Sequence, residues 1–212
     1  MILSLIYQTI VIVLLLSFSF GPAFFALINT GIKHGYKTGS LLALGIVLSD
    51  FLLCLLVILL IDLGAAHLIH DEMNQRFMGL MAGLVLVVFG ALYFRKPIAK
   101  KDVTIVIGKP SAGTMIFKGF FLNSLNPAVW LLWLGNVTAV SKSLKYSVFK
   151  MILYFGITLG LVLLVELAKV SAAGKLKKVL TEKTMHKINS ITGFLLIVFG
   201  VVLIYNHYFG LT

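Results

Sequence analysis

Charged residues are scarce in this sequence. They make up 12% of its 212 residues, whereas hydrophobic residues make up 60%, and a typical soluble domain has about 25% charged residues. So few charges cannot cover the surface of a soluble enzyme domain, and so high a hydrophobicity excludes intrinsic disorder. The apolar runs are long and nearly unbroken, unlike the alternating segments of about ten residues in transmembrane β-strands. The composition therefore predicts an all-α integral membrane protein.

Cysteine is scarcer still, because Cys54 is the only one. A single cysteine excludes an internal disulfide and any redox relay that needs a cysteine pair, so Cys54 is expected to be a small core or lipid-facing residue. The sequence also lacks a Walker-type phosphate loop and the HExxH pattern of zinc proteases. His67 and His70 have no accompanying ligand motif and favour a solvated loop. We therefore expect no cofactor and no metal site.

Six apolar segments are long enough to cross a lipid bilayer, which takes about 20 helical residues. These segments are residues 2–27, 40–61, 77–94, 119–140, 148–165 and 191–208. We therefore predict six transmembrane helices. The longest connection between them, about 95–118, mixes Lys, Gly and Pro as a linker does, and leaves no room for a soluble domain.

The net charge of +11 comes from Lys and Arg residues in the connections between these segments. The first, third and fifth loops, the last beginning with Lys169, hold fourteen of them, and the second and fourth loops hold four. Because cytoplasmic loops are enriched in Lys and Arg, we predict that these three loops are cytoplasmic and that both termini face outward. The need to orient the protein in the membrane accounts for the excess of Lys and Arg, so the positive charge does not call for a nucleic-acid partner.

Two stretches in the first half of the chain recur in the second half, in the same order. SFGPA at 19–23 resembles SLNPA at 124–128, and GLVLVVFG at 83–90 resembles GFLLIVFG at 193–200. The matches fall in the first and third predicted spans of each half. Coincidence between glycine-rich helices is the alternative explanation.

These matches predict two repeats of three helices each. The first repeat, with the cytoplasmic loop, covers residues 1–110, and the second covers residues 111–212. Since three spans carry the chain to the opposite side of the membrane, the second repeat enters the membrane inverted relative to the first. Two inverted repeats are a common architecture of secondary transporters.

Proline interrupts the first and fourth predicted spans at Pro22 and Pro127. A proline inside a helix removes a backbone N–H and clashes with the carbonyl four residues earlier, so the carbonyls of Phe18 and Asn123 are expected to lose their helical partners. The preceding residues, Gly21 and Asn126, tolerate unusual backbone angles. Interrupted helices at matching places in two repeats point to a transporter's substrate site; two structural kinks would leave the same pattern.

Asp50 lies halfway along the second predicted span, where inserting a charge costs about 2.5–3.5 kcal/mol. It is a candidate for carrying a proton, for binding a substrate ammonium group or for holding a cation. The alternative is a structural carboxylate bonded to Ser49 or to a neighbouring helix. Glu166, near the cytoplasmic end of the fifth span, is expected to form an interfacial ion pair with Lys169 three residues later.

Small and aromatic residues in the spans are expected to serve packing. Glycines recur at four-residue intervals, which permit close contact between helices. They are Gly31, Gly35 and Gly39, Gly79 and Gly83, and Gly156 and Gly160. Trp130 and Trp133 are expected to serve packing and lipid contact.

Two stretches of the chain resemble a known family. The first is FGPAFFALINTGIKHGYKTG at 20–39, continuing to GIVLSD at 45–50, and the second is GFFLNSLNPAVW at 119–130. Both are similar to the lysine exporter and homoserine/threonine exporter translocators, the LysE/RhtB type, and the resemblance covers nearly the whole chain. In that family the first motif commonly begins Pro-Gly-Pro, where this chain has Phe20. The resemblance implies export of amino acids or similar small metabolites, driven by the proton gradient.

With this resemblance, the sequence predicts a multi-pass exporter of the bacterial inner membrane that is not an enzyme. Its partners are an amino-acid-like solute, protons and the lipid bilayer, and a homo-oligomer is left open. The predicted site lies near the midplane and consists of Asp50, Gly21, Pro22, Asn123, Asn126 and Pro127. An intramembrane enzyme would need a cluster of catalytic groups at one depth, where Asp50 stands alone. A passive channel or small-cation carrier would call for a ring of acids, which the sequence does not show.

Overall fold

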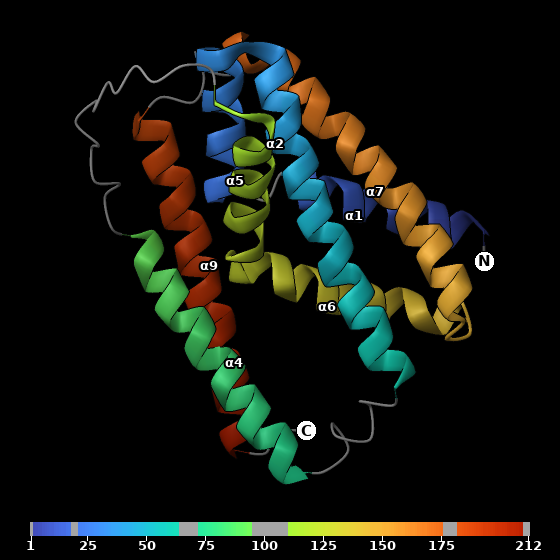
Figure 1. Ribbon diagram of the computed structural model, residues 1–212. Helices are drawn as coiled ribbons and strands as arrows, with labels where there is room; N and C mark the ends of the chain where they lie inside the picture. Colours follow the sequence, from blue (N-terminus) through green and yellow to red (C-terminus); the bar gives the residue numbers. More distant parts are fainter. Residues whose placement is uncertain (1, 18–20, 64–71, 95–109, 176–181, 210–212) are drawn as a thin grey trace. The chain divides into compact units, whose positions relative to one another are not determined.

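The computed structural model describes residues 2–17, 21–63, 72–94, 110–175 and 182–209 (Figure 1). The chain is helical through almost all of these ranges and forms no strand within them. The prediction of an all-α protein is therefore confirmed for this part of the chain. Phe18, His67, His70 and most of the predicted third loop lie outside the described residues.

Contacts between helices divide the chain into two compact units. The first comprises Met1–Leu68 and Ala112–Lys177, and the second comprises Ile69–Ser111 and Lys178–Thr212. Each unit thus takes one segment from each half of the sequence. The two repeats stay a prediction, since compactness in space does not test a relation between sequences.

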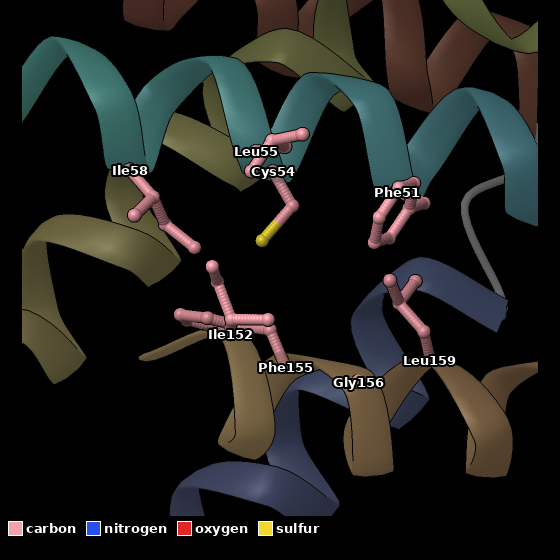
Figure 2. A pocket seen from close by; sticks show the side chains of 8 residues that line it. All are labelled: Phe51, Cys54, Leu55, Ile58, Ile152, Phe155, Gly156 and Leu159. Atoms are coloured by element: carbon pink, nitrogen blue, oxygen red, sulfur yellow. The ribbon is translucent and has the colours of Figure 1, made fainter. Parts of the chain in front are cut away.

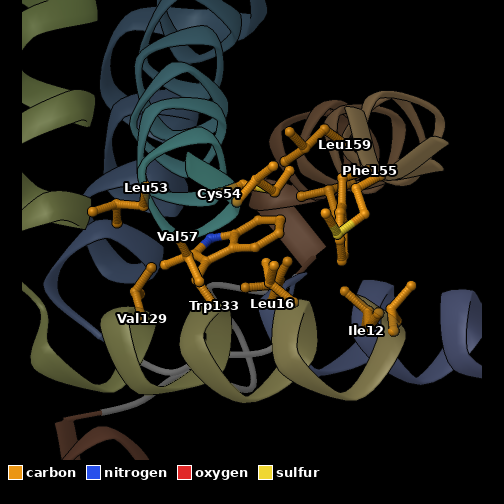
Figure 3. Close-up of a cluster of buried hydrophobic side chains, with 14 of the residues drawn as sticks. Ile12, Leu16, Leu53, Cys54, Val57, Val129, Trp133, Phe155 and Leu159 are labelled. Atoms are coloured by element: carbon orange, nitrogen blue, oxygen red, sulfur yellow. The ribbon is translucent and has the colours of Figure 1, made fainter. Parts of the chain in front are cut away.

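The first unit is built around a buried aromatic pair. Its described helices are α1 (Ile2–Ser17), α2 (Pro22–Asp62), α5 (Ala112–Ser124), α6 (Pro127–Ser143) and α7 (Val148–Ser171). Trp133 of α6 and Phe155 of α7 are almost fully buried and lie edge to face, with ring centres 5.6 Å apart. Side chains from α1 and α2, among them Ile12, Leu16 and Cys54, close around this pair (Figure 3). Cys54 is therefore a core residue and not a lipid-facing one, which were the two predicted alternatives.

Helix α2 turns back on itself in its middle, at Gly35. This residue has φ 79° and ψ 179°, angles that glycine adopts without strain. A Cβ added to Gly39 would lie 3.3 Å from the Cα of Gly31, whereas residues eight apart in a straight helix are about 12 Å apart. The chain therefore reverses at Gly35, and α2 consists of the two limbs 22–34 and 36–62, which can be followed in the ribbon of Figure 1.

The first and fourth predicted spans are both interrupted at the predicted positions. Helix α1 ends at Ser17 and α2 begins at Pro22, and α5 ends at Ser124 and α6 begins at Pro127. In Figure 1, α6 runs across the direction of α5 instead of continuing it. Each of these two predicted spans is therefore a pair of helices with a break between them.

The second unit consists, among the described residues, of α4 (Glu72–Tyr93) and α9 (Glu182–Phe209). Their glycines meet backbone to backbone. A Cβ added to Gly83 would lie 2.7 Å from the carbonyl oxygen of Gly200, and one added to Gly90 would lie 2.7 Å from that of Gly193. The two helices are therefore antiparallel and in close contact, as four-residue glycine spacing predicts for Gly83.

This contact has the symmetry that a two-fold axis requires. In the sequence match, Gly83 corresponds to Gly193 and Gly90 corresponds to Gly200. If each residue of the Gly83–Gly200 contact is replaced by its counterpart in the other half, the result is the Gly193–Gly90 contact. Both contacts occur. The α4–α9 pair therefore agrees with an inverted repeat, although the six-span arrangement as a whole stays a prediction.

We expect Gly200→Ala to destabilise the protein. The new Cβ would lie 2.6 Å from the carbonyl oxygen of Gly83, and relieving such overpacking costs about 1–3 kcal/mol, more than the gain of up to about 1 kcal/mol in helix propensity. Gly83→Ala should have a similar effect, because its contacts mirror those of Gly200. Thermal unfolding of the detergent-solubilised protein measures both.

Gly160→Ala is the matched control, because a Cβ at that position in α7 meets no atom within 4 Å. This variant should be at least as stable as the unmodified protein. Equal stability of Gly200→Ala and Gly160→Ala would contradict the close contact between α4 and α9.

The packing role predicted for glycine is wrong at three positions. A Cβ at Gly156 or Gly160 would meet no atom within 4 Å, so the four-residue interval in α7 does not mark a helix contact. Gly35 likewise serves the reversal of α2 and not a contact. Four-residue spacing alone does not distinguish a glycine that faces a neighbouring helix from one that faces away from it.

Two described helices, α2 and α7, have the length and apolar composition to cross a membrane. Leu3–Ser17, Gly79–Tyr93 and Ser190–Asn206 are shorter apolar helices. Many of their large apolar side chains are exposed, as in a protein whose outer surface meets lipid. The number of spans and the outward-facing termini stay predictions.

Candidate functional site

Asp50 is buried in the first unit and accepts two hydrogen bonds. Its Oδ1 atom accepts from Nδ2 of Asn123 and from Nε1 of Trp133, both at 2.9 Å. These donors come from α5 and α6, while Asp50 belongs to the second limb of α2, and only 3% of its surface is exposed. A buried carboxylate with two directed donors meets the requirement that buried polar groups be hydrogen-bonded.

Two glycines bring Asn123 to Asp50. Gly45 on α2 and Gly119 on α5 each contact the backbone of the opposite helix, at the carbonyls of Ile116 and Leu42, so that no side chain separates the helices. Asn123 lies one turn after Gly119, on the same face of α5. Its Nδ2 atom also lies 3.3 Å from the carbonyl oxygen of Ile46 and from Oγ of Ser49.

Trp133 orients Asp50 from the other side, a role that the sequence analysis missed. Its indole rises from α6 toward α2 in Figure 3, and no part of its surface is exposed. Of the predicted packing and lipid contact, the packing of Trp133 is confirmed, the lipid contact is wrong because the side chain is fully buried, and the hydrogen bond to Asp50 was not predicted. The signal that could have found it is that a buried indole N–H needs an acceptor, and Asp50 is the one acid in the middle of a span.

A buried ion pair lies nearby, at the end of α7. Nζ of Lys169 lies 2.7 Å from Oε1 of Glu166, and the two side chains are 7% and 4% exposed. The predicted i, i+3 pair is confirmed, but it is buried in the protein, and Lys169 belongs to the helix and not to a loop. The helix continues to Ser171 and the first limb of α2 covers its end, through Gly31 and Val170.

The ammonium group of Lys169 has further partners within the part of the chain that the structure describes. It donates a hydrogen bond to the backbone carbonyl of Ser17, the last residue of α1. It also lies over the ring of Phe24, 4.9 Å from the ring centre, in a cation–π contact. Lys169 thus joins the end of α7 to both sides of the break between α1 and α2.

A small polar pocket lies between these groups. It is lined by Leu16, Ser17, Ala23, Phe24, Ile46, Asn123, Asn126, Glu166 and Lys169. Five helices of the first unit contribute to it, if Asn126 is counted with α6. The pocket has room for about one water molecule. The hydroxyl oxygen of Ser17 is buried and has no hydrogen-bond partner among the described residues.

The predicted site residues hold different positions around this pocket. Asn123 and Asn126 line it. Asp50 lies behind its wall and reaches it through Asn123. Gly21, Pro22 and Pro127 belong to the helix starts beside it and do not themselves line it.

The two prolines act differently from what the sequence predicts. Pro22 and Pro127 stand in the first turns of α2 and α6, after Gly21 and Asn126 as N-cap residues. The missing N–H is harmless there, because the first N–H groups of a helix have no partner within it. Oδ1 of Asn126 caps α6 by accepting from the backbone N–H of Ala128, at 3.2 Å.

The freed carbonyl predicted at Asn123 is not found. This oxygen accepts a hydrogen bond from the backbone N–H of Asn126 at 3.0 Å, because a tight turn ends α5 before α6 begins. The polar groups that the break exposes to the pocket are therefore the side chains of Asn123 and Asn126.

A second pocket in the first unit has a different character. It lies between α2 and α7 and is lined by Phe51, Cys54, Leu55, Ile58, Ile152, Phe155, Gly156 and Leu159 (Figure 2). None of these side chains carries a charge or an oxygen atom. A polar solute would find no partner there, so the polar pocket is the candidate site.

Comparisons with known proteins agree on one family. The chain is 28% identical over 201 residues to the "Putative amino acid efflux protein YcgF" of Bacillus subtilis (strain 168), an alignment that covers 93% of this chain and 94% of that protein. No solved structure matches the chain. The family model described as LysE type translocator matches residues 14–207, a range that includes every residue of the polar pocket. The chain therefore belongs to the LysE type translocator family.

Proposed function

We propose that this translocator exports amino acids across the bacterial inner membrane, with protons moving in the opposite direction. Support comes from family membership and from the amino acid efflux named for its relative in Bacillus subtilis. Membership in a family of translocators also disfavours the alternative of an intramembrane enzyme.

The observation that carries the proposal is the composition of the polar pocket. In an otherwise apolar unit, its wall brings together a carboxylate, an ammonium group and two carboxamides, from Glu166, Lys169, Asn123 and Asn126. An amino acid carries one ammonium and one carboxylate group, and each finds an oppositely charged partner here. Polar groups are costly inside a membrane and mark substrate or ion pathways.

Asp50 is suited to carry the coupled proton. It lies next to the pocket without lining it, and Asn123 connects the two by donating to Oδ1 of Asp50. The ionised carboxylate holds Nδ2 of Asn123 and so leaves Oδ1 of that amide to accept from the solute, whereas a proton on Asp50 weakens this hold and competes for the same amide oxygen. The solute and the proton would thus exclude each other through one side chain, as exchange requires.

The pocket as described is a closed state. Its space for about one water molecule is too small for an amino acid, so the helices around it have to separate for binding. The break after Ser124 divides α5 from α6, and helix ends of this kind are where hinges occur. Opening to either side in turn would give alternating access.

Transport into proteoliposomes tests the proposal. Purified protein is reconstituted in liposomes that contain a pH-sensitive dye, and gradients of single amino acids are imposed. We expect proton movement that depends on the amino acid, and accumulation of a labelled amino acid against its gradient that a protonophore abolishes. Competition by unlabelled amino acids identifies the substrate.

The rival functions give different results in this assay. A passive channel would equilibrate solutes without accumulating them and without moving protons. Chemical conversion of a lipid or solute in the same liposomes would indicate an enzyme. Either result would contradict the proposed exchange.

A further inference from the structure

The ammonium group of Lys169 is surrounded by three kinds of cation-binding group. They are the carboxylate of Glu166 at 2.7 Å, the backbone carbonyl of Ser17 and the face of the Phe24 ring at 4.9 Å. Carboxylates bind ammonium groups by charge-assisted hydrogen bonds, and aromatic faces bind them by cation–π attraction. We call Glu166, Ser17 and Phe24 the ammonium cage.

The cage is more than an ion pair between neighbours on one helix. Glu166 and Lys169 are one turn apart on α7, and such a pair needs no third partner. The backbone carbonyl of Ser17, the last described residue of α1, accepts the hydrogen bond from Lys169. Phe24 comes from the other side of the same break. The interruption of the first span thus builds two of the three walls.

The cage opens into the polar pocket. Ser17, Phe24, Glu166 and Lys169 all line the pocket. The hydroxyl oxygen of Ser17 is buried and has no partner among the described residues, and Ser17 is only 1% exposed. Buried polar groups without partners are rare in native proteins, so this hydroxyl marks a place where another group binds in a different state.

We propose that the ammonium cage is the subsite for the amino group of the exported solute, and that Lys169 fills it when no solute is bound. The solute's ammonium displaces that of Lys169. The displaced Lys169, on its flexible four-carbon stem, then pairs with the solute's carboxylate. This inference rests on the proposed function and names the chemical class that the site selects: zwitterions with a primary ammonium group.

Charge pairing favours such an exchange. In the closed state, Lys169 neutralises Glu166 inside the protein. A bound amino acid keeps both charges paired, because it adds one charge of each sign between them. A carboxylic acid without an amino group would pair with Lys169 but leave Glu166 without a cation, which is strongly unfavourable for a buried charge. The cage therefore rejects deaminated analogues.

The experiment removes the lysine and supplies its ammonium group from solution. Lys169→Ala leaves the cage empty, and n-butylammonium has the four-carbon stem and the ammonium group of a whole lysine side chain, one methylene more than this variant removes. We expect n-butylammonium to raise the melting temperature of the purified variant saturably, by about 4 °C near saturation. The unmodified protein should respond much less, because Lys169 already fills the cage.

Two controls separate the cage from simple filling of a hole. n-Butanol has nearly the same shape without the charge, and the double variant Glu166→Gln, Lys169→Ala lacks the carboxylate. Neither combination should give the saturable shift. An equal shift with n-butanol, or in the double variant, would overturn the cage as an ammonium site.

A second variant covers the case in which Lys169→Ala does not fold. Lys169→Met keeps the apolar stem but ends before the position of Nζ, so ammonium ion itself is the probe. Ammonium chloride should stabilise this variant more than sodium chloride does. Equal effects of the two salts would overturn the cage.

Transport by the unmodified protein tests the role of the cage in export. An unlabelled amino acid should raise the apparent KM with little change in the maximal rate, whereas its deaminated analogue should not compete, because it would leave Glu166 without a cation. If the cage binds n-butylammonium in Lys169→Ala but the deaminated analogue competes as well as the amino acid does, the cage holds Lys169 alone and its role as a solute subsite is overturned. If no amino acid is transported at all, the proposed function fails, while cation binding by the cage is decided by the melting experiments.

Discussion

Asp50→Asn is expected to lower export against a gradient at least tenfold, while the protein remains folded. Oδ1 of Asn can still accept from Asn123 and Trp133, which both donate to Asp50 at 2.9 Å, so the packing of α5 and α6 on α2 is kept. The amide cannot take up a proton at physiological pH. Solute binding and passive equilibration should survive, whereas accumulation and its dependence on pH should be lost.

Asp62→Asn is the matched control for this substitution. Asp62 is the last residue of the same helix and is exposed, so the same chemical change there should leave accumulation and its pH dependence intact. Transport of a labelled amino acid into proteoliposomes at a series of pH values measures both variants. Normal pH dependence in Asp50→Asn would make Asp50 structural and place the coupling elsewhere, with Glu166 as the next candidate.

Substitutions of Trp133 are expected to have the largest effect on stability. Trp133→Ala would open a cavity in the core around Phe155, and truncations of this kind cost about 3–5 kcal/mol. Trp133→Phe keeps an aromatic ring but removes the N–H that bonds Asp50. Because hydrogen bonds to charged groups contribute about 1.5–3 kcal/mol, Trp133→Phe should be folded but less stable, and the pH dependence of its transport should differ from that of the unmodified protein.

Trp130→Phe gives the comparison on the same helix. The Trp130 indole donates to the carbonyl of Ser124 at 2.7 Å, but 44% of its surface is exposed, so its loss should cost well under 1 kcal/mol. Thermal unfolding ranks the variants, and the pH profile of transport distinguishes a role at Asp50 from packing alone. Equal effects of Trp130→Phe and Trp133→Phe on both measurements would contradict the role assigned to the Trp133–Asp50 hydrogen bond.

Much of the helical layout could be predicted from the sequence, because it depends on local patterns. Apolar runs of about 20 residues form helices in lipid, where every backbone group needs an internal partner. The breaks near Pro22 and Pro127 follow from the chemistry of proline and of the residues before it. The match between 83–90 and 193–200 drew attention to glycines that do lie against each other in α4 and α9.

Contacts between helices could not be predicted in the same way. The sequence shows that Gly156 and Gly160 share a face of α7, but not whether another helix packs closely on that face, and among the described residues no atom lies within 4 Å of a Cβ added at either position. Gly45 and Gly119 are the glycines that bring α2 and α5 into backbone contact. Which helix faces are paired depends on the whole assembly.

By itself, the sequence determined the kind of protein and its central acid. An apolar composition excludes a soluble fold, and a carboxylate in mid-span is too costly to be incidental, so Asp50 stands out without any coordinates. The motifs around Gly21 and Asn126 further indicated the translocator family that the comparisons established.

Only the tertiary structure decided which groups surround the pocket. Asp50, Asn123 and Trp133 are up to 83 residues apart in the chain, and Lys169 donates to Ser17 across 152 residues. No local pattern encodes such pairs, because they arise where helices from distant segments pack together. For the same reason Lys169, which charge counting places in a cytoplasmic loop, is a buried residue of the pocket: its environment is set by the first limb of α2 and the end of α1, which cover the end of α7.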